Sequence, residues 1–298
     1  MNLRCGNRVT CFRAMMACVV VTSAVASASA QESRLPLPGS FLESLFSGES
    51  LEPRDADGRM ETERHDFTQS TTTVGRHVVQ FESGYTFFYR AEEDETSHAA
   101  PELFMRYGLM ENLEIRIRYN KAWQFGEEDR IGSEDLGLSF KFRTTDQRCR
   151  IPESALEVRF TAPTGDKEWS TGDVEFGLDY IYGWRLSEVA EIYGSTGFST
   201  NALAEFAFAT LMPDGENFML YTQSVALGLE VTDRVAMYTE VFGLFTDGFE
   251  DDEESPVFFN IGVDYYLSDD IVFDVRVGTG LNNDAEDLFA GIGGGIRF

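Results

Sequence analysis

Apolar and polar side chains alternate one by one over most of the chain after residue 76. Successive side chains of a β-strand point to opposite faces, so this period of two predicts strands with one apolar and one polar face. In 113–119 the apolar set is Leu113, Ile115, Ile117 and Tyr119, and the polar set is Glu114, Arg116 and Arg118. The pattern predicts twelve strands, at about 77–90, 99–107, 113–124, 135–143, 154–161, 174–186, 190–201, 218–231, 235–246, 256–267, 271–281 and 287–298.

The predicted connections also alternate, between tight and long. Tight links fall at 108–112, 187–189, 232–233 and 268–270, and longer ones separate the remaining pairs, with 144–153 and 282–286 departing from this rhythm. Bacterial membrane barrels have an even number of antiparallel strands, short inner turns and longer outer loops. We therefore predict an all-β fold, a transmembrane antiparallel up-and-down β-barrel of about twelve strands. The segments 190–201 and 218–231 alternate poorly, so their faces are not assigned.

The first 75 residues are expected to lie outside the strand pattern. Residues 1–30 resemble a cleaved secretory signal peptide, with three arginines before an apolar core and small residues at 28–30; a retained anchor helix is the alternative. Residues 31–75 are polar and irregular, which suits a periplasmic leader, a plug inside the lumen or a disordered stretch. The barrel is then expected at 76–298, in the outer membrane of a Gram-negative cell.

The chain is strongly acidic, with 51 acidic and 24 basic residues and a formal net charge of −27 at pH 7. Such a charge repels phosphates, so nucleic acid is not expected as a partner. Acidic runs in the predicted outer loops, at 92–95, 127–129 and 250–254, are read either as solvated surface or as a negative vestibule for cations. No apolar run after residue 30 is long enough for a membrane helix, which fits a soluble periplasmic protein as well as a barrel.

The predicted inner faces carry eighteen charged side chains, nine acidic and nine basic. Buried ions must pair or be solvated, so a soluble β-sandwich could not hold them in its core. They fit an inner network of ion pairs, a water-filled pore, or both. The candidates for the lumen lining are Glu82, Glu102, Arg106, Glu114, Arg116, Arg118, Lys141, Arg143, Glu157, Arg159, Glu175, Asp179, Arg185, Glu240, Asp264, Asp274, Arg276 and Arg297.

Aromatic side chains gather near the ends of the predicted strands, where membrane barrels carry their interfacial girdles. The candidates are Tyr85, Phe87, Tyr89, Trp123, Tyr182, Trp184 and Tyr265. Phe298 closes the last strand and is expected to serve as the signal for the machinery that assembles barrels. Outer-membrane lipids and that machinery are therefore the expected partners, together with a small-molecule solute.

Enzymatic chemistry finds little support in the sequence. The three histidines, His65, His77 and His98, are scattered, and no G-x-S-x-G elbow is present. No cluster of histidine and cysteine with metal-ligand spacing follows residue 30. We expect neither a catalytic site, nor a cofactor, nor a metal.

Several stretches of the sequence together match the pattern of a known family. They are 66–74, Gln80-Phe-Glu-Ser-Gly84, Pro101 to Leu109, Leu113-Glu-Ile-Arg116, Pro163-Thr-Gly165, Thr232-Asp-Arg234, Glu240, Asp274, 278–281, Asp287, Phe289 and Gly291. They resemble the outer-membrane family described as "putative MetA-pathway of phenol degradation". The resemblance spans about 64–298, and the sequence has Arg64-His65-Asp66 where the family pattern has Arg-Pro-Asp. It implies a β-barrel and transport of small solutes, aromatic or hydrophobic ones among them.

The polar inner face favours a passive outer-membrane channel or transporter over an inert barrel. The alternative is a non-conducting structural or adhesive barrel whose acidic loops carry out its function. Residues 31–75 would support that alternative if they filled the bore permanently.

Overall fold

The computed structural model describes residues 58–91, 94–126, 129–148, 150–200, 219–247 and 255–298. The predicted signal peptide, the first part of the leader and most of the acidic runs lie outside these residues. The strands are β1 (Val79–Arg90), β2 (Glu95–Met110), β3 (Leu113–Phe125), β4 (Arg130–Ser133), β5 (Leu136–Thr145), β6 (Glu153–Ala162), β7 (Glu175–Arg185), β8 (Ala190–Thr200), β9 (Met219–Thr232), β10 (Val235–Asp247), β11 (Val257–Ser268), β12 (Ile271–Gly280) and β13 (Leu288–Arg297), with one short 3-10 helix, η1 (Lys167–Trp169).

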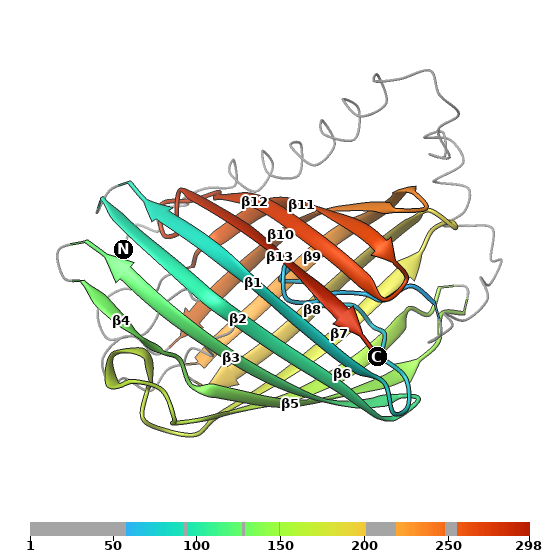
Figure 1. The fold of residues 1–298 in the computed structure, drawn as a ribbon, viewed down its shortest axis with the longest axis horizontal. Coiled ribbons are helices and arrows are strands. Elements are labelled where there is room, and N and C mark those ends of the chain that lie inside the picture. Colours follow the sequence, from blue (N-terminus) through green and yellow to red (C-terminus); the bar gives the residue numbers. More distant parts are fainter. Residues whose placement is uncertain (1–57, 92–93, 127–128, 149, 201–218, 248–254) are drawn as a thin grey trace, which may run out of the picture. The chain divides into compact units, whose positions relative to one another are not determined.

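The strands form one antiparallel sheet that closes on itself (Figure 1). β1 pairs with β13 on one side and with β2 on the other, and β2 pairs with β3. β3 then continues through β5 to β13, each strand beside its neighbour in sequence. Twelve strands make the ring, and the short β4 pairs only with the end of β3. The predicted closed barrel of about twelve strands is confirmed.

One connection was predicted wrongly, and a second, correctly predicted as long, contains a strand that was not predicted. β2 begins at Glu95 rather than near residue 99, so the first connection is short instead of long. Its first residues look like a polar loop, but Thr96 and His98 lie opposite Tyr89 and Phe87 of β1, in regular register. β4 likewise occupies part of the long link predicted between 124 and 135.

The barrel wall is apolar outside and polar inside. Exposed apolar side chains stand on the outer faces of the strands, among them Phe81, Leu103, Phe140, Phe273 and Ile292. A closed ring leaves no unpaired sheet edge, which is the condition for a sheet to span lipid. Within the described residues, no helix is long and apolar enough to cross a membrane.

The side chains of β8 and β9 explain why apolar and polar residues alternate poorly in 190–201 and 218–231. Their inner faces carry small polar residues such as Ser195 and Ser224, which are buried and hydrogen-bonded to each other at 2.8 Å. Their outer faces carry Thr196 and Gln223, whose side chains are hydrogen-bonded at 2.8 Å. Gln223 Nε2 also donates to the hydroxyl of Tyr182 at 3.1 Å. Because polar groups stand on both faces, the hydropathy contrast disappears.

The connection between β6 and β7 is folded against β4. Asp135 accepts hydrogen bonds from the backbone N–H groups of Thr164 and Gly165, at 2.9 and 2.8 Å. Asp166 accepts from the backbone N–H of Ser133 at 2.7 Å and from its hydroxyl at 3.1 Å. Both hydrogen bonds lower the pKa of Asp166 below its ordinary value, and the bond from the backbone N–H has the larger effect. The buried Trp169 completes the contact with this strand.

Candidate functional site

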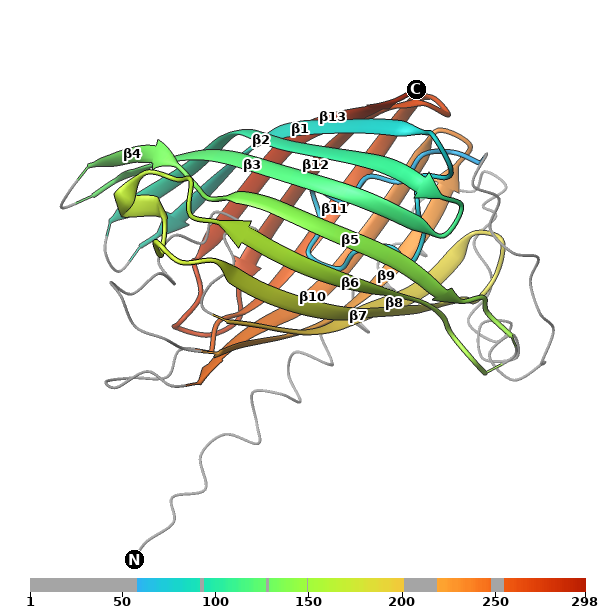
Figure 2. The same ribbon diagram turned by 90° about the horizontal axis from the view of Figure 1, so that it is seen from below.

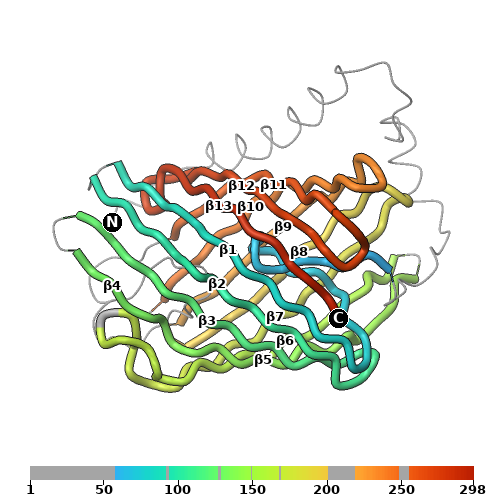
Figure 3. The backbone as a smooth tube through the Cα atoms, in the orientation of Figure 1, coloured from blue at the N-terminus to red at the C-terminus, as the bar shows by residue number. Residues whose placement is uncertain are grey.

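Residues 58–75, the inserted segment, lie inside the barrel (Figure 2). The segment bonds to inward side chains of strands on opposite sides of the ring: Arg64 to β2 and β12, Phe67 to β10 and Thr71 to β6. A chain that touches strands all round a closed ring must lie within it. Figure 3 traces the segment in blue among the surrounding strands.

Both ends of the inserted segment meet the same end of the barrel. The backbone N–H of Met60 donates to the carbonyl of Asp269, in the turn between β11 and β12, at 2.8 Å. Thr73 Oγ1 donates to the carbonyl of Glu111, in the turn between β2 and β3, at 2.6 Å. We call this the short-turn end, and the opposite one, with the connections 163–174 and 281–287, the long-loop end. The segment therefore folds into the bore and back out.

Three glutamates of the wall hold the backbone of the inserted segment. Glu82 of β1 accepts from the N–H groups of residues 63 and 64, at 2.8 and 2.9 Å. Glu240 of β10 accepts from those of residues 67 and 68, both at 2.9 Å. Glu114 of β3 accepts from the N–H of Val74 at 2.8 Å. A segment without regular structure thus has five of its amides paired, as buried amides require.

Glu63 is the centre of a buried ionic cluster. Lys141 Nζ lies 2.5 Å from one carboxylate oxygen and Arg106 Nη2 lies 3.2 Å from it, while Arg116 pairs with the other oxygen. All four side chains are essentially inaccessible to solvent. Arg106 pairs further with Glu114 at 3.0 Å. This single carboxylate of the inserted segment therefore links three cations of the wall, on β2, β3 and β5.

Arg64 crosses to the opposite part of the wall. It donates to Glu102 of β2 at 2.7 Å and to Asp274 of β12. Its guanidinium lies against Gly84 and Gly293, where a Cβ atom would collide with it. Glycine at these two inward positions therefore makes room for the arginine.

The residue that follows, His65, is also buried. Its Nε2 lies 3.1 Å from Asp264, and its carbonyl accepts from Tyr238 at 2.9 Å and from Arg276 at 2.8 Å. His77 and His98 contact the hydroxyls of Tyr107 and Tyr85. In the described part of the chain, no histidine is bonded to a serine or cysteine, and no group of three or more acidic, histidine or cysteine side chains could hold a metal.

The structure brings most of the remaining lumen candidates into the same interior. Arg116 pairs with Glu157 at 2.5 Å, and Arg159 with Asp179 at 2.6 Å. Glu175 accepts from Thr161 at 3.0 Å, and the guanidinium of Arg118 stacks 4.4 Å from the ring centre of Phe104. Three candidates lie at the short-turn end instead: Arg143 pairs with Asp146, Arg297 with Asp270, and the backbone of Arg185 with Gln147.

Aromatic rings gather on one side of the bore toward the long-loop end. Phe242 of β10 stacks on Phe67, the innermost apolar residue of the inserted segment, with ring centres 4.4 Å apart. Phe258 and Phe289 close around Phe242, with ring centres 4.9 and 6.5 Å away from it. The buried cluster, called the aromatic cluster below, consists of Phe67, Phe88, Ala99, Leu220, Phe242, Leu244, Phe258, Ala285 and Phe289. Sequence reasoning missed this cluster.

The predicted interfacial aromatics stand on the outer faces of their strands. His98 lies among several of them, stacked on Trp123 with ring centres 5.4 Å apart and bonded to Tyr85. Trp184 Nε1 donates to the carbonyl of Arg150, near the short-turn end. The others are Phe87, Tyr89, Tyr182 and Tyr265, of which Tyr265 is the most exposed. Phe298 is exposed and bonds through its backbone to Val79.

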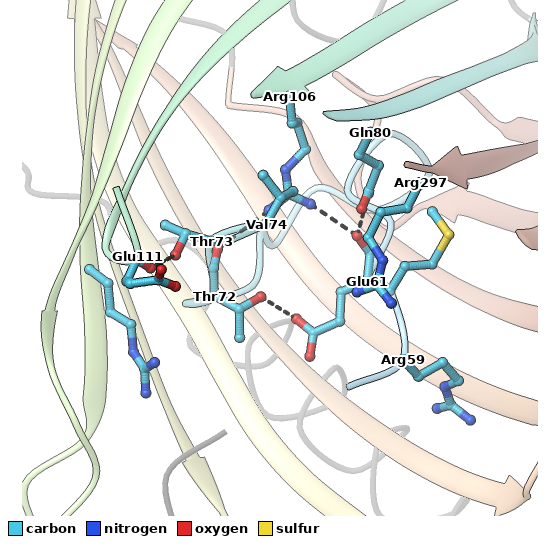
Figure 4. A pocket seen from close by; sticks show the side chains of 11 residues that line it. Arg59, Glu61, Thr72, Thr73, Val74, Gln80, Arg106, Glu111 and Arg297 are labelled. Atoms are coloured by element: carbon cyan, nitrogen blue, oxygen red, sulfur yellow. Dashed lines mark hydrogen bonds between the residues drawn. The ribbon is translucent and has the colours of Figure 1, made fainter. Parts of the chain in front are cut away.

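A small polar cavity opens at the short-turn end, between the inserted segment and the wall (Figure 4). Its volume is about 50 Å³. Thr72 donates to Glu61 at 2.6 Å, and the carbonyl of Glu61 accepts from Gln80 and Arg106. The lining is Arg59, Met60, Glu61, Thr72, Thr73, Val74, Gln80, Arg106, Glu111, Arg143 and Arg297.

The family described as "Putative MetA-pathway of phenol degradation" has a model that matches residues 62–298. The crystal structure of the COG4313 outer membrane channel from Pseudomonas putida F1 is similar, with a TM-score of 0.58 and 12% identity over 80% of this chain and 100% of that one. The NanC porin has a TM-score of 0.48, with 7% identity over 74% of this chain and 100% of that one. At 12% identity the first likeness establishes the fold alone. No curated protein sequence matches the chain.

Proposed function

Because the chain belongs to the family described as "Putative MetA-pathway of phenol degradation", and its closed barrel is polar inside and apolar outside, we propose that it is an outer-membrane channel for passive passage of small solutes. One observation carries the proposal. The bore is occupied by a chain segment held through ion pairs and hydrogen bonds, instead of being sealed by side chains of the wall alone. The barrel is not an enzyme in this proposal.

The interior offers different chemistry on its two sides near the long-loop end. β1, β2, β9, β10, β11 and β13 contribute the wall residues of the aromatic cluster. β3, β5, β6 and β7 contribute polar side chains, including Asn120, Ser139, Arg159 and Asp179. A small solute with an aromatic ring and one polar group would meet a suitable surface on each side. We therefore propose small aromatic or hydrophobic molecules with a polar substituent as the solute class.

The inserted segment controls access in this proposal. Both of its ends lie at the short-turn end, so it can leave the bore without threading past a strand. Its contacts are mainly polar, and water can replace them when the segment moves out. We propose that residues 31–57 belong to the same leader and that a cleaved signal peptide precedes it.

Single-channel recording in planar bilayers tests the channel. The full mature chain is expected to give small or infrequent conductance steps, and a variant lacking residues 31–75 larger and more frequent ones. A variant lacking only residues 31–57 is the matched control, since it keeps the inserted segment and should behave like the full chain. Bilayers that stay silent with the 31–75 deletion inserted would remove the channel.

The solute class is tested on the 31–75 deletion by current block. A small aromatic alcohol is expected to reduce the current more than an aliphatic alcohol of equal carbon number, because its ring can stack on the phenylalanines. Equal block by the two alcohols would contradict the aromatic preference while leaving the channel intact.

A non-conducting structural or adhesive barrel is the second candidate. The buried carboxylate of Glu63 is ion-paired with three buried cations of the wall, those of Arg106, Arg116 and Lys141. This arrangement favours an inserted segment that never leaves the bore. A full mature chain that never conducts, beside a 31–75 deletion that does, would support this reading.

A further inference from the structure

The cavity at the short-turn end has the composition of an anion site. Four arginines line it, against two carboxylates, those of Glu61 and Glu111. Two of the arginines come from strands that are not adjacent, Arg143 from β5 and Arg297 from β13, and Arg59 comes from the inserted segment. Figure 4 shows Arg59, Arg106 and Arg297 arranged around Glu61. We propose that this cavity binds one small oxyanion, a phosphate or carboxylate group, between the inserted segment and the barrel wall.

The arginines at the rim of the cavity have weak internal partners. Arg297 pairs with Asp270 and Arg143 with Asp146, whose side chains are 57% and 47% exposed. Ion pairs to such exposed carboxylates contribute little stability, because water screens them. Arg143 Nε is buried and lacks a hydrogen-bond partner among the described residues. The guanidinium of Arg143 can therefore turn to a bound anion at small cost. Arg297 also donates to the carbonyl of Gly58 at 2.7 Å, and a guanidinium has five N–H groups with which to bind an anion as well.

Arginine suits this ligand better than any other side chain. Its planar fork binds carboxylate and phosphate oxygens through two parallel hydrogen bonds. Thr72 and Thr73 add hydroxyls to the lining of the cavity. Both hydroxyls now donate within the protein, to Glu61 and to the carbonyl of Glu111, and each can rotate toward a ligand.

The volume limits the size of the ligand. One water needs about 10 to 15 Å³ of such space, so 50 Å³ holds a few waters or one oxyanion group. An aromatic ring does not fit. The anion site is therefore distinct from the aromatic cluster, and the inference does not depend on the proposed solute.

Isothermal titration of the full mature chain tests the site, in a neutral maltoside detergent and chloride buffer at constant ionic strength. Inorganic phosphate is expected to bind at one site, and acetate at the same site in competition with it. Arg143→Gln and Arg297→Gln should each weaken binding roughly tenfold, the loss expected for a hydrogen bond to a charged group. Arg234→Gln is the control, because this exposed arginine lies at the same end but does not line the cavity.

Two results would overturn the site. The first is no saturable binding of phosphate or acetate to the wild-type chain. The second is unchanged affinity in a variant, Arg143→Gln or Arg297→Gln, that keeps the circular dichroism of the barrel. Arg143 is partly exposed and, among the residues that the structure describes, forms its ion pair with Asp146, so its substitution tests the site even if Arg297→Gln does not fold.

Discussion

Paired charges fill the half of the bore next to the short turns, whereas the half next to the long loops has a cluster of aromatic rings on one side. In the first, Glu63 joins Arg106, Arg116 and Lys141 at hydrogen-bond distances. In the second, Phe67 meets Phe242 and its neighbours. The inserted segment contributes to both, a carboxylate to one and a ring to the other.

The difference concerns specificity. Charges taken out of water need every partner in place, since one that loses its partner keeps the full cost of burial. Rings attract each other without a fixed partner, so an apolar cluster tolerates small shifts. The ionic half therefore fixes the register of the inserted segment, and the aromatic half closes the bore above it. Removing one group from each half should show this contrast.

Glu63→Gln is expected to have the largest effect. It removes the only carboxylate of the inserted segment that faces three buried cations, so unfolding free energy should fall by about 3–5 kcal/mol. Urea unfolding in lipid vesicles measures the loss. Glu188→Gln, an exposed site in the turn after β7, is the matched control and should change stability little. A loss as small as that of the control would mean that the ionic half does not hold the segment.

Phe242→Ala should cost somewhat less, about 3 kcal/mol, because it leaves a cavity between Phe67 and Phe258. The same unfolding measurement applies. Phe245→Ala is the control on the same strand, since Phe245 stands on the outer face and its loss leaves no internal cavity. Equal losses of stability in the two variants would mean that the aromatic half has no sealing role. The same would follow if Phe242→Ala left the conductance unchanged while Phe245→Ala raised it.

Most of the barrel could be predicted from the sequence, because a period of two fixes which side chains share a face. The lumen candidates Glu82, Glu114 and Glu240 were found in this way. Their partners could not be found. Residues 58–75 have no period, and the pairs that hold them, such as Arg64 with Asp274, join positions far apart in sequence. Only the closed ring brings these groups together.

The sequence does contain a signal for the aromatic cluster, although the alternation of apolar and polar residues alone does not reveal it. Phe87-Phe88 and Phe258-Phe259 are doublets, and a doublet in a strand puts one ring on each face. Phe88 and Phe258 are buried inside, while Phe87 and Phe259 are only partly buried on the outer wall. Doublets in a barrel strand therefore predict an apolar patch in the lumen as well as one toward lipid.

Asp166 lies outside the bore and can be compared with Glu63, because its carboxylate is hydrogen-bonded but exposed. Its pKa is lowered in the folded chain, so its contribution is present above the ordinary aspartate value of about 3.9 and is lost as pH falls through the folded value. Asp166→Asn should speed hydrogen exchange at the Ser133 amide by about tenfold at most, without a measurable change in global unfolding. Hydrogen exchange of wild type and variant, compared at pH 6 and at decreasing pH below about 3.9, measures this, and the two should converge as Asp166 becomes protonated. If Asp166→Asn destabilised the barrel as much as Glu63→Gln does, burial would not be what separates the ionic half of the bore from an ordinary surface carboxylate.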